Sequence, residues 1–531
     1  MKKKGIVLIL ILILCIITFT TCILNHYVSF FSLSNEQSNH ELIEISISLW
    51  DIENALSGGE NDLALQRLQD MFHIKLVPMN VTWDDFQQKI PLWAASGTLP
   101  DVFTLDIIGS ATYYDWIDTG IIQGLPTDLS HYPNLAEYVN SEDFDFPYKV
   151  DGQIFSIPRK SYPDIESTSV GRVLFYRWDL AQAVGITEEP ETYQDFVDMM
   201  VRIIAADPED KNIQGLTSTQ ASLLNSFLFN YSIPGGELQG TTYRWTKQED
   251  GTFLPSYFAG DMMATFQLAR DMYQSGAIEP NIATNTTQQS NELFLQGKCA
   301  AILRSGGAIG AYNDYGRYWE EIYPGQDFLE DVRLLPLLES IDGNRYYNFA
   351  NVAYSETYIS SSVSAEKLDR ILQLYDFLAT DEGYQLVNYG LEGVDFEVVD
   401  GYVQLLVEYD DILAKYPLCA SGNSLLEWGR AGWDETVPGK TPEEYRQMNI
   451  ARKEEAVTIG ILPSHDLRYS YLNLPLKNDL FFTTPDDLLT IMISTEPVET
   501  MVNQLLADYE SKGLSAVIHE VNQAATELGW Q

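Results

Sequence analysis

Aromatic, acidic and basic side chains stand where predicted strands end. Trp50 and Asp51 follow the alternating stretch LIEISISL, Asp106 ends the apolar stretch VFTLD, and Arg304 follows CAAIL. Rings and planar polar groups of these types bind ligands that offer flat apolar faces and hydrogen-bonding edges. The chemistry that these residues favour is therefore non-covalent binding.

Two tryptophans farther along the chain extend this set. Trp428 and Trp433 lie in LLEWGRAGWDE, five positions apart. Residues on one helix face lie three or four positions apart, so this spacing favours a loop that presents both rings. We expect the two tryptophans, with the four residues above, to contact a ligand.

Signatures of catalysis are absent from the sequence. It contains no G-x-S-x-G, no H-E-x-x-H and no P-loop, and SGGAIG lacks the lysine and the spacing of a nucleotide loop. The 6 histidines do not have the spacing of metal ligands. Pairs of carboxylates arise by chance among 76 acidic residues, so an enzyme acting on polysaccharides is kept only as an alternative. We expect no catalytic residue, no metal and no cofactor.

Length and charge limit the fold and the partners. A chain of 531 residues is too long for one ordinary core and implies two or more lobes. Its 45% apolar and 20% charged residues are typical of a globular protein. A net charge of −44 would repel phosphate groups, which argues against nucleic acid as a partner.

The N-terminus has the pattern of an exported, membrane-attached chain. Lys2–Lys4 precede an apolar run from Gly5 to Leu24, close to the ~20 residues that cross a bilayer. Basic residues stay cytoplasmic, so the rest of the chain is expected outside the cell. Residues 1–24 are the signal or anchor and 25–41 a tether. The anchor is either a retained helix or a lipid on Cys22, which follows an imperfect lipoprotein box.

Beyond this segment the sequence has only Cys299 and Cys419. Two cysteines are too few for a disulfide scaffold. We expect two separate buried thiols, with one bridge between them as the alternative.

Strands and helices alternate after the tether. LIEISISLW, IKLVPMNV and VFTLD predict strands; Asn61 is expected to cap the helix between the first two, and a second helix spans residues 83–95 and ends near Gly97. This order is typical of a parallel sheet with crossover helices. Ligands of such sheets bind outside the carboxyl ends of the strands, where Trp50 and Asp106 lie.

The same alternation begins again at VLFY, residues 173–176. Asp179 begins a helix that Gly185 ends, and Thr192 with Asp195 predicts a capping box for the next helix. A second α/β lobe is therefore expected to start here.

Five segments, taken in order, resemble one protein family. SGTLPDVFTLD, DGQIFSIPRK, LFYRWDLAQAVGITEEPETYQDF, NELFLQGKCAAILRSGG and FLATDEGYQLVNYGLEGVDFEVVDG are similar to the serial signatures of extracellular solute-binding proteins of family 1. These are the sugar-binding subunits of bacterial ABC importers. The length and the element YGLEGVDFEVVDG resemble the long lipoprotein subgroup of Gram-positive bacteria.

The resemblance implies a two-lobe α/β fold of the periplasmic-binding-protein type, with strands that cross the hinge. The chain would cross near residues 156–158 and 332–336, and again near residue 380. The expected first lobe comprises 42–157 and 335–380. The expected second lobe comprises 158–334 and 381–531, with the C-terminal helices.

The resemblance also implies a function and its partners. A monomer tethered to the outer face of the membrane would capture a carbohydrate, expected to be an oligosaccharide, between its lobes and deliver it to the permease subunits of an ABC importer. Trp50 occupies a place where relatives often supply an aromatic ring. A membrane-anchored glycan sensor of the same fold is the alternative.

One loop departs from the family pattern. Many long relatives carry a calcium loop where this chain reads DPEDKNIQG. Asp207 and Glu209 keep oxygen ligands at the first two alternate positions, but Lys211 places a cation at the third, and the turn has no glycine. A solvated loop without calcium is therefore expected.

Overall fold

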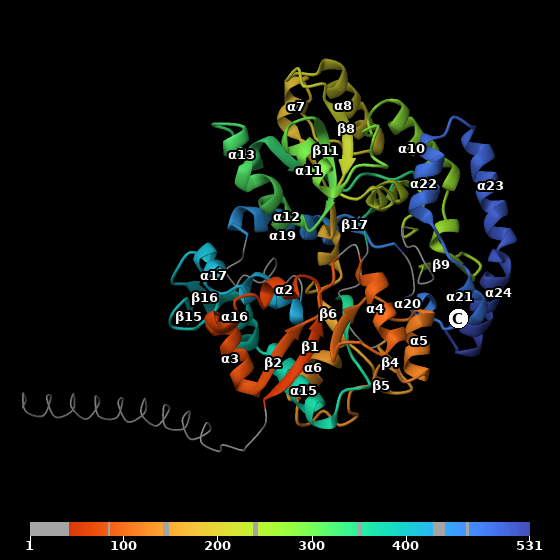
Figure 1. Cartoon of the computed structure of the whole chain (residues 1–531). Helices are drawn as coiled ribbons and strands as arrows, with labels where there is room; N and C mark the ends of the chain where they lie inside the picture. Colours follow the sequence, from red (N-terminus) through yellow and green to blue (C-terminus); the bar gives the residue numbers. More distant parts are fainter. Residues whose placement is uncertain are drawn as a thin grey trace, which may run out of the picture.

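The computed structural model describes residues 42–82, 85–141, 148–236, 243–348, 353–427, 441–463 and 467–530. The chain forms two lobes, each built on its own β-sheet and covered by helices (Figure 1). The expected two-lobe α/β fold is confirmed. The anchor segment, the tether, Cys22, Trp428 and Trp433 lie outside the described residues. No helix within the described ranges combines the length and the apolar character needed to cross a bilayer.

Lobe 1 is the lobe whose sheet contains the first strand. Its strands lie in the order β2-β1-β3-β14-β6, with bounds β1 Ile43–Ser48, β2 Ile74–Pro78, β3 Val102–Leu105, β6 Ile157–Lys160 and β14 Ala353–Ile359. β1 is parallel to β2 and β3, as the sequence predicts, and β14 runs antiparallel to β3 and β6. The carboxyl ends of β1 and β3 therefore share one edge of the sheet.

Helices cover both faces of the lobe 1 sheet and follow local sequence signals. α3 is capped by Asp62, whose carboxylate accepts from the Leu65 N–H at 2.9 Å, one residue after the expected Asn61. α4 ends at Gly97, whose φ of +68° is readily adopted by glycine. The helices of this lobe are α2 Ile52–Ala55, α3 Leu63–Phe72, α4 Phe86–Ser96, α5 Ala111–Asp118, α6 Pro133–Val139, α15 Ala365–Leu378, α16 Asp381–Tyr389, α17 Tyr409–Lys415 and α18 Leu418–Ser421. Its hairpins pair β4 Lys149–Val150 with β5 Gln153–Ile154, and β15 Phe396–Val399 with β16 Tyr402–Leu405.

Lobe 2 contains the second sheet, in the order β12-β7-β11-β8. Its strands are β7 Arg172–Arg177, β8 Gln214–Ser218, β11 Cys299–Ser305 and β12 Val332–Leu334. The capping box of Thr192 and Asp195 is present at the start of α8. Helices of this lobe are α7 Trp178–Ala183, α8 Tyr193–Ala206, α9 Leu224–Leu228, α10 Met262–Gln274, α11 Thr287–Leu295, α12 Gly307–Ala311, α13 Arg317–Ile322 and α14 Phe328–Asp331. Short strands β9 Trp245–Lys247 and β10 Phe253–Pro255 form a hairpin.

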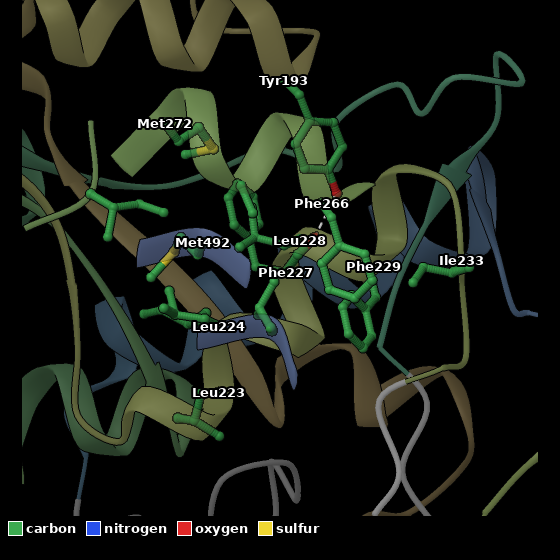
Figure 2. Close-up of a cluster of buried hydrophobic side chains, with 14 of the residues drawn as sticks. Tyr193, Leu223, Leu224, Phe227, Leu228, Phe229, Ile233, Phe266, Met272 and Met492 are labelled. Atoms are coloured by element: carbon green, nitrogen blue, oxygen red, sulfur yellow. Dashed lines mark hydrogen bonds between the residues drawn. The ribbon is translucent and has the colours of Figure 1, made fainter. Parts of the chain in front are cut away.

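The C-terminal helices complete the core of lobe 2. Figure 2 shows Met492 of α22 among side chains of α9 and α10, including Phe227 and Phe266. The Tyr193 hydroxyl donates to the Phe227 carbonyl at 2.9 Å within this core. The helices after the third crossing are α19 Glu443–Thr458, α20 Leu467–Ser470, α21 Pro475–Asp479, α22 Thr484–Ile493, α23 Val498–Ser511 and α24 Leu514–Glu527.

The division of the chain between lobes differs from the expected one after residue 380. Side chains of α16, α17 and α18 pack in the same core as β1 and α3, so residues 381–427 lie in lobe 1. The next described helix, α19, contacts η3 (Glu166–Val170) and α12 of lobe 2. The third crossing therefore follows residue 427 and not residue 380.

The two described cysteines lie in different lobes. Cys299 begins β11 in lobe 2, Cys419 lies in α18 of lobe 1, and both are buried and free. The expectation of two separate buried thiols is confirmed.

Candidate functional site

A stacked pair of aromatic rings lies in lobe 1, just after β1. Trp50 is buried, with 3% of its surface exposed, and its ring centroid lies 6.2 Å from that of Tyr354 with planes 27° apart. Phe86 packs edge-on against Trp50 at 4.7 Å, and the guanidinium carbon of Arg159 lies 5.6 Å from the Trp50 ring. Tyr354 is 40% exposed. Tyr354 is thus the accessible ring of the pair, and Trp50 supports it from within the lobe.

Asp106, directly after β3, has an exposed side chain that nearby protein atoms partly desolvate. Desolvation by the surrounding protein raises the pKa of its carboxyl. Protein atoms therefore crowd Asp106 although its side chain is accessible to solvent. Burial, followed by the charge of Asp106, raises the pKa of Tyr354, so these two side chains lie near each other.

A second carboxyl lies beneath Asp106. Glu356 of β14 is 2% exposed and accepts a hydrogen bond from the Tyr358 hydroxyl at 2.9 Å. Burial, and then the neighbouring charge of Asp106, raises its pKa well above the usual range. The charge of Asp106 thus disfavours ionisation of Glu356, and Asp106 is the exposed one of the two carboxyls.

Lobe 2 contributes two guanidinium groups that lie near each other. Arg172 begins β7, and burial followed by the charge of Arg244 lowers its pKa to about 10. Burial lowers the pKa of Arg244, which is 5% exposed, to about 9. The charge of Arg172 also acts on Tyr354 of lobe 1. Arg172 of lobe 2 and Asp106 of lobe 1 are therefore both near enough to Tyr354 to act on it electrostatically.

A recess lies in lobe 2, beside the start of β7. It is lined by Ser169 of η3 and Arg172 of β7, by Tyr346 and Asn348 of the chain between β12 and β14, and by Arg452 of α19, together with apolar side chains of lobe 2. Polar side chains from segments far apart in the sequence therefore face the same space.

A strap of C-terminal chain, residues 469–472, packs against lobe 1 near α5. The Tyr114 hydroxyl of α5 donates to the Tyr471 carbonyl at 2.9 Å. Gly109 lies against the Tyr471 ring so closely that a Cβ there would stand 2.0 Å from a ring carbon. Tyr471 packs in a core cluster of lobe 1, whereas Tyr469 and Leu472 pack in the core of lobe 2.

The contacts of Arg304 lie within its own lobe. Its guanidinium pairs with Asp314 at 2.9 Å and donates to the carbonyls of Gly310 and Ser305 at 2.6 and 2.9 Å. It is 7% exposed and lies over the Tyr315 ring. These contacts attach α12 and the following turn to β11 and favour a structural role. Ligand contact by Arg304 stays a prediction.

Asp51 also has partners within its lobe. It has a φ of +63° before α2, and its carboxylate accepts from the Ser421 hydroxyl of α18 at 2.6 Å and from the Asn54 amide. The side chain is exposed and ties two helices of lobe 1 together. Its role in binding likewise stays a prediction, as do those of Trp428 and Trp433.

Sequence reasoning missed Tyr354, Arg172, Arg244 and Tyr471 as wall residues. Tyr354 and Arg172 lie near the starts of strands, and attention to strand ends alone overlooked the antiparallel β14 and β7. Arg244 and Tyr471 lie just outside regular elements and carry no local signal.

The described side chains suit binding better than chemistry. Rings, carboxyls and guanidiniums can stack on a ligand and hydrogen-bond to it. Nowhere in the described ranges do three or more His, Cys, Asp or Glu side chains gather in a way that could hold a metal ion.

Comparisons with known proteins give a consistent result. The family model described as bacterial extracellular solute-binding protein matches residues 58–385. Lipoprotein LipO of Bacillus subtilis is 23% identical over 331 residues, which span 61% of this chain and 62% of LipO. The polygalacturonan/rhamnogalacturonan-binding protein YtcQ of Bacillus subtilis is 21% identical over 343 residues, spanning 63% of this chain and 64% of YtcQ. The alignments thus cover less than two thirds of either relative.

Solved structures share the fold over nearly the whole chain. The S. pneumoniae ABC-transporter substrate binding protein FusA in complex with kestose has a TM-score of 0.69 at 14% identity, covering 92% of this chain and 99% of that chain. An EF-hand mutant of FusA with fructo-nystose has a TM-score of 0.66 at 15% identity, with coverage of 92% and 99%. The alginate-binding protein AlgQ2 without calcium ion has a TM-score of 0.64 at 14% identity, with coverage of 91% and 98%.

Proposed function

The chain belongs to the bacterial extracellular solute-binding proteins, and from this premise we propose that it captures an oligosaccharide between its lobes for delivery to an ABC importer. The ligands named for similar proteins support this proposal. FusA is described with kestose, and YtcQ as a binder of polygalacturonan and rhamnogalacturonan. The family is one of binding proteins, and we propose that this chain likewise performs no catalysis.

The observation that carries the proposal is the accessible Tyr354 ring, which feels the charges of Asp106 in lobe 1 and of Arg172 in lobe 2. An exposed aromatic ring offers the flat apolar surface on which a sugar ring stacks. The Asp106 carboxylate accepts hydrogen bonds from sugar hydroxyls, and the Arg172 guanidinium donates from the other lobe. The buried Trp50 fixes the plane of the Tyr354 ring.

Closure of the lobes follows from contacts on both walls. A ligand that touches Tyr354 in lobe 1 and Arg172 in lobe 2 binds the closed arrangement more tightly than the open one. The difference in affinity shifts the population toward closure. The permease subunits would then meet the protein in its closed form, with the ligand bound.

The N-terminal segment supplies the location in this proposal. Residues 1–24 direct the chain outside the cell and hold it at the membrane, by a lipid on Cys22 or by a retained helix. The name of LipO, a lipoprotein, supports attachment. Fractionation that found the untagged protein in the cytoplasm would contradict both export and import.

A glycan screen tests the proposed function. The purified protein is heated with fructo-, galacturono-, rhamnogalacturono- and chito-oligosaccharides, because a ligand at ~100 times its Kd adds ~2.7 kcal/mol of stability. We expect at least one glycan class to raise the Tm, and calorimetry to give a saturable isotherm. If no glycan bound and amino acids or peptides did, the carbohydrate assignment would be wrong.

A further inference from the structure

The loop between α8 and β8, residues 207–213, is closed by its first aspartate. The Asp207 carboxylate accepts from the backbone N–H groups of Lys211 at 3.1 Å, Asn212 at 2.9 Å and Ile213 at 3.2 Å. These hydrogen bonds engage both of its oxygens and lower its pKa. The carboxylate thus organises the loop backbone through direct hydrogen bonds.

The second acidic residue of the loop is neutralised by side chains of the protein. Glu209 pairs through one oxygen with Arg177 at 2.8 Å and through the other with Lys211 at 2.7 Å. Arg177, at the end of β7, is fully buried and also pairs with Asp179 at 2.5 Å. Burial opposes ionisation of Glu209, but these partners offset it and its pKa is lowered. Glu209 and Asp179 are therefore both paired with Arg177, and Glu209 is also paired with Lys211.

Aromatic rings and a glycine enclose these ion-paired side chains. The Lys211 ammonium lies 4.9 Å from the Tyr323 ring, and the Arg177 guanidinium carbon lies 5.3 Å from the Trp319 ring. A Cβ on Gly297 would stand 2.9 Å from the Lys211 nitrogen and 2.8 Å from the Glu209 carboxylate. The Lys211 side chain therefore occupies a fitted place that joins the loop to α13 and to the turn before β11.

Calcium is the cation that similar proteins suggest for such a loop. One solved structure is described as an EF-hand mutant of FusA and another as AlgQ2 without calcium ion. Calcium takes six to eight oxygen ligands. Here the third alternate position carries an ammonium group, which already lies against the Glu209 carboxylate. The residues present do not fit a calcium ion.

We propose that Lys211 and Arg177 act as built-in cations in place of a divalent metal, so that this loop and lobe 2 are stable without calcium. A tethered ammonium pairs with Glu209 at any calcium concentration, because it cannot dissociate from the chain. Lobe 2 then keeps its α8–β8 connection in calcium-poor surroundings.

The test compares metal sensitivity and charge variants of the full-length chain by Tm. We expect the wild-type Tm to be the same in EDTA and in millimolar Ca²⁺. Lys211→Met should lower the Tm by about 2 °C or more, because Glu209 loses one of its partners, whereas Lys211→Arg should stay near wild type. Lys298→Met, at an exposed lysine next to Gly297, is the matched control and should leave the Tm unchanged.

Two results would overturn the proposal. One is a wild-type protein that gains stability in Ca²⁺ and loses it in EDTA. The other is a Lys211→Met variant that melts with the wild type. The wild-type comparison alone decides the matter if Lys211→Met fails to fold.

Discussion

The ring of Tyr354 stacks on the ring of Trp50 at one edge of the lobe 1 sheet, with centroids 6.2 Å apart and planes 27° apart. The outer ring is 40% exposed and the inner ring 3%. The ring expected to contact a ligand, Trp50, is thus buried in the lobe, and the accessible ring beside it is that of Tyr354.

Substitution of each ring separates contact with a ligand from support of the lobe. Tyr354→Ala should weaken glycan binding by ~1–3 kcal/mol, on the scale of an aromatic ring stacked on a base, with a small change in Tm. Trp50→Ala should instead cost ~3–5 kcal/mol of stability because it opens a cavity in the core. Titration calorimetry and melting curves on both variants measure the two quantities. Tyr402→Ala, at an exposed tyrosine of the β15–β16 hairpin, is the control.

Equal affinity of Tyr354→Ala and the wild type would exclude Tyr354 from the ligand contacts. A Trp50→Ala variant with wild-type Tm and reduced affinity would return the binding role to Trp50.

Asp106 predicts a pH dependence of stability. Its pKa is raised in the folded state, so the folded protein holds this proton more tightly than the unfolded chain does. The stability associated with Asp106 is therefore present below the ordinary aspartate pKa and is lost as pH rises through the raised value. Asp106→Asn should make the protein more stable than wild type at neutral pH and bring no gain in acid.

Asp106→Asn should also weaken glycan binding at neutral pH, since the amide replaces a carboxylate acceptor by a weaker one. Denaturant melts at several pH values and calorimetry at neutral pH measure both effects. Asp115→Asn, at an exposed aspartate of α5, is the control. A variant with unchanged affinity would remove Asp106 from the site, and an unchanged pH profile would contradict its desolvation.

Small-angle scattering tests lobe closure. A verified glycan ligand should reduce the radius of gyration, because contacts on both walls favour the closed state. Arg172→Ala removes a lobe 2 contact and should reduce this change at a given ligand concentration. Identical scattering with and without saturating ligand would contradict closure.

The burial of both described cysteines predicts how they react with an alkylating reagent. Burial raises the pKa of the Cys299 thiol, and Cys419 is fully buried in the other lobe. We expect neither peptide to be alkylated in the native protein, both to react in denaturant, and reductant to leave the Tm unchanged. Rapid native labelling of Cys299, or a mass matching a bridged pair of peptides, would contradict this arrangement.

Much of the fold was predictable because its signals are local. Alternation and capping placed the strands around Trp50 and Asp106 in a parallel sheet, and the capping box of Thr192 depends on residues three positions apart. The third crossing was not predictable in this way. The amphipathic helices α15 and α16 show an apolar face, but such a face does not say which core it will join.

The site was predictable only in part for a related reason. A position after a strand tells where a residue lies along the sheet edge, and this located Trp50 and Asp106. It does not tell whether the side chain points inward, and Trp50 does. Tyr354 reaches the same edge through an antiparallel strand that enters from about 250 residues later in the sequence.

The strap at Tyr471 links the two lobes at a point other than the hinge. Because Tyr471 packs in a core cluster of lobe 1, while Tyr469 and Leu472 pack in the core of lobe 2, separation of the lobes must either detach the Tyr471 ring from Gly109 or stretch the few residues between them. Because few residues join the two cores there, they limit the distance to which the lobes can separate. The size of ligand that can enter between the lobes therefore depends on this strap as well as on the crossing segments.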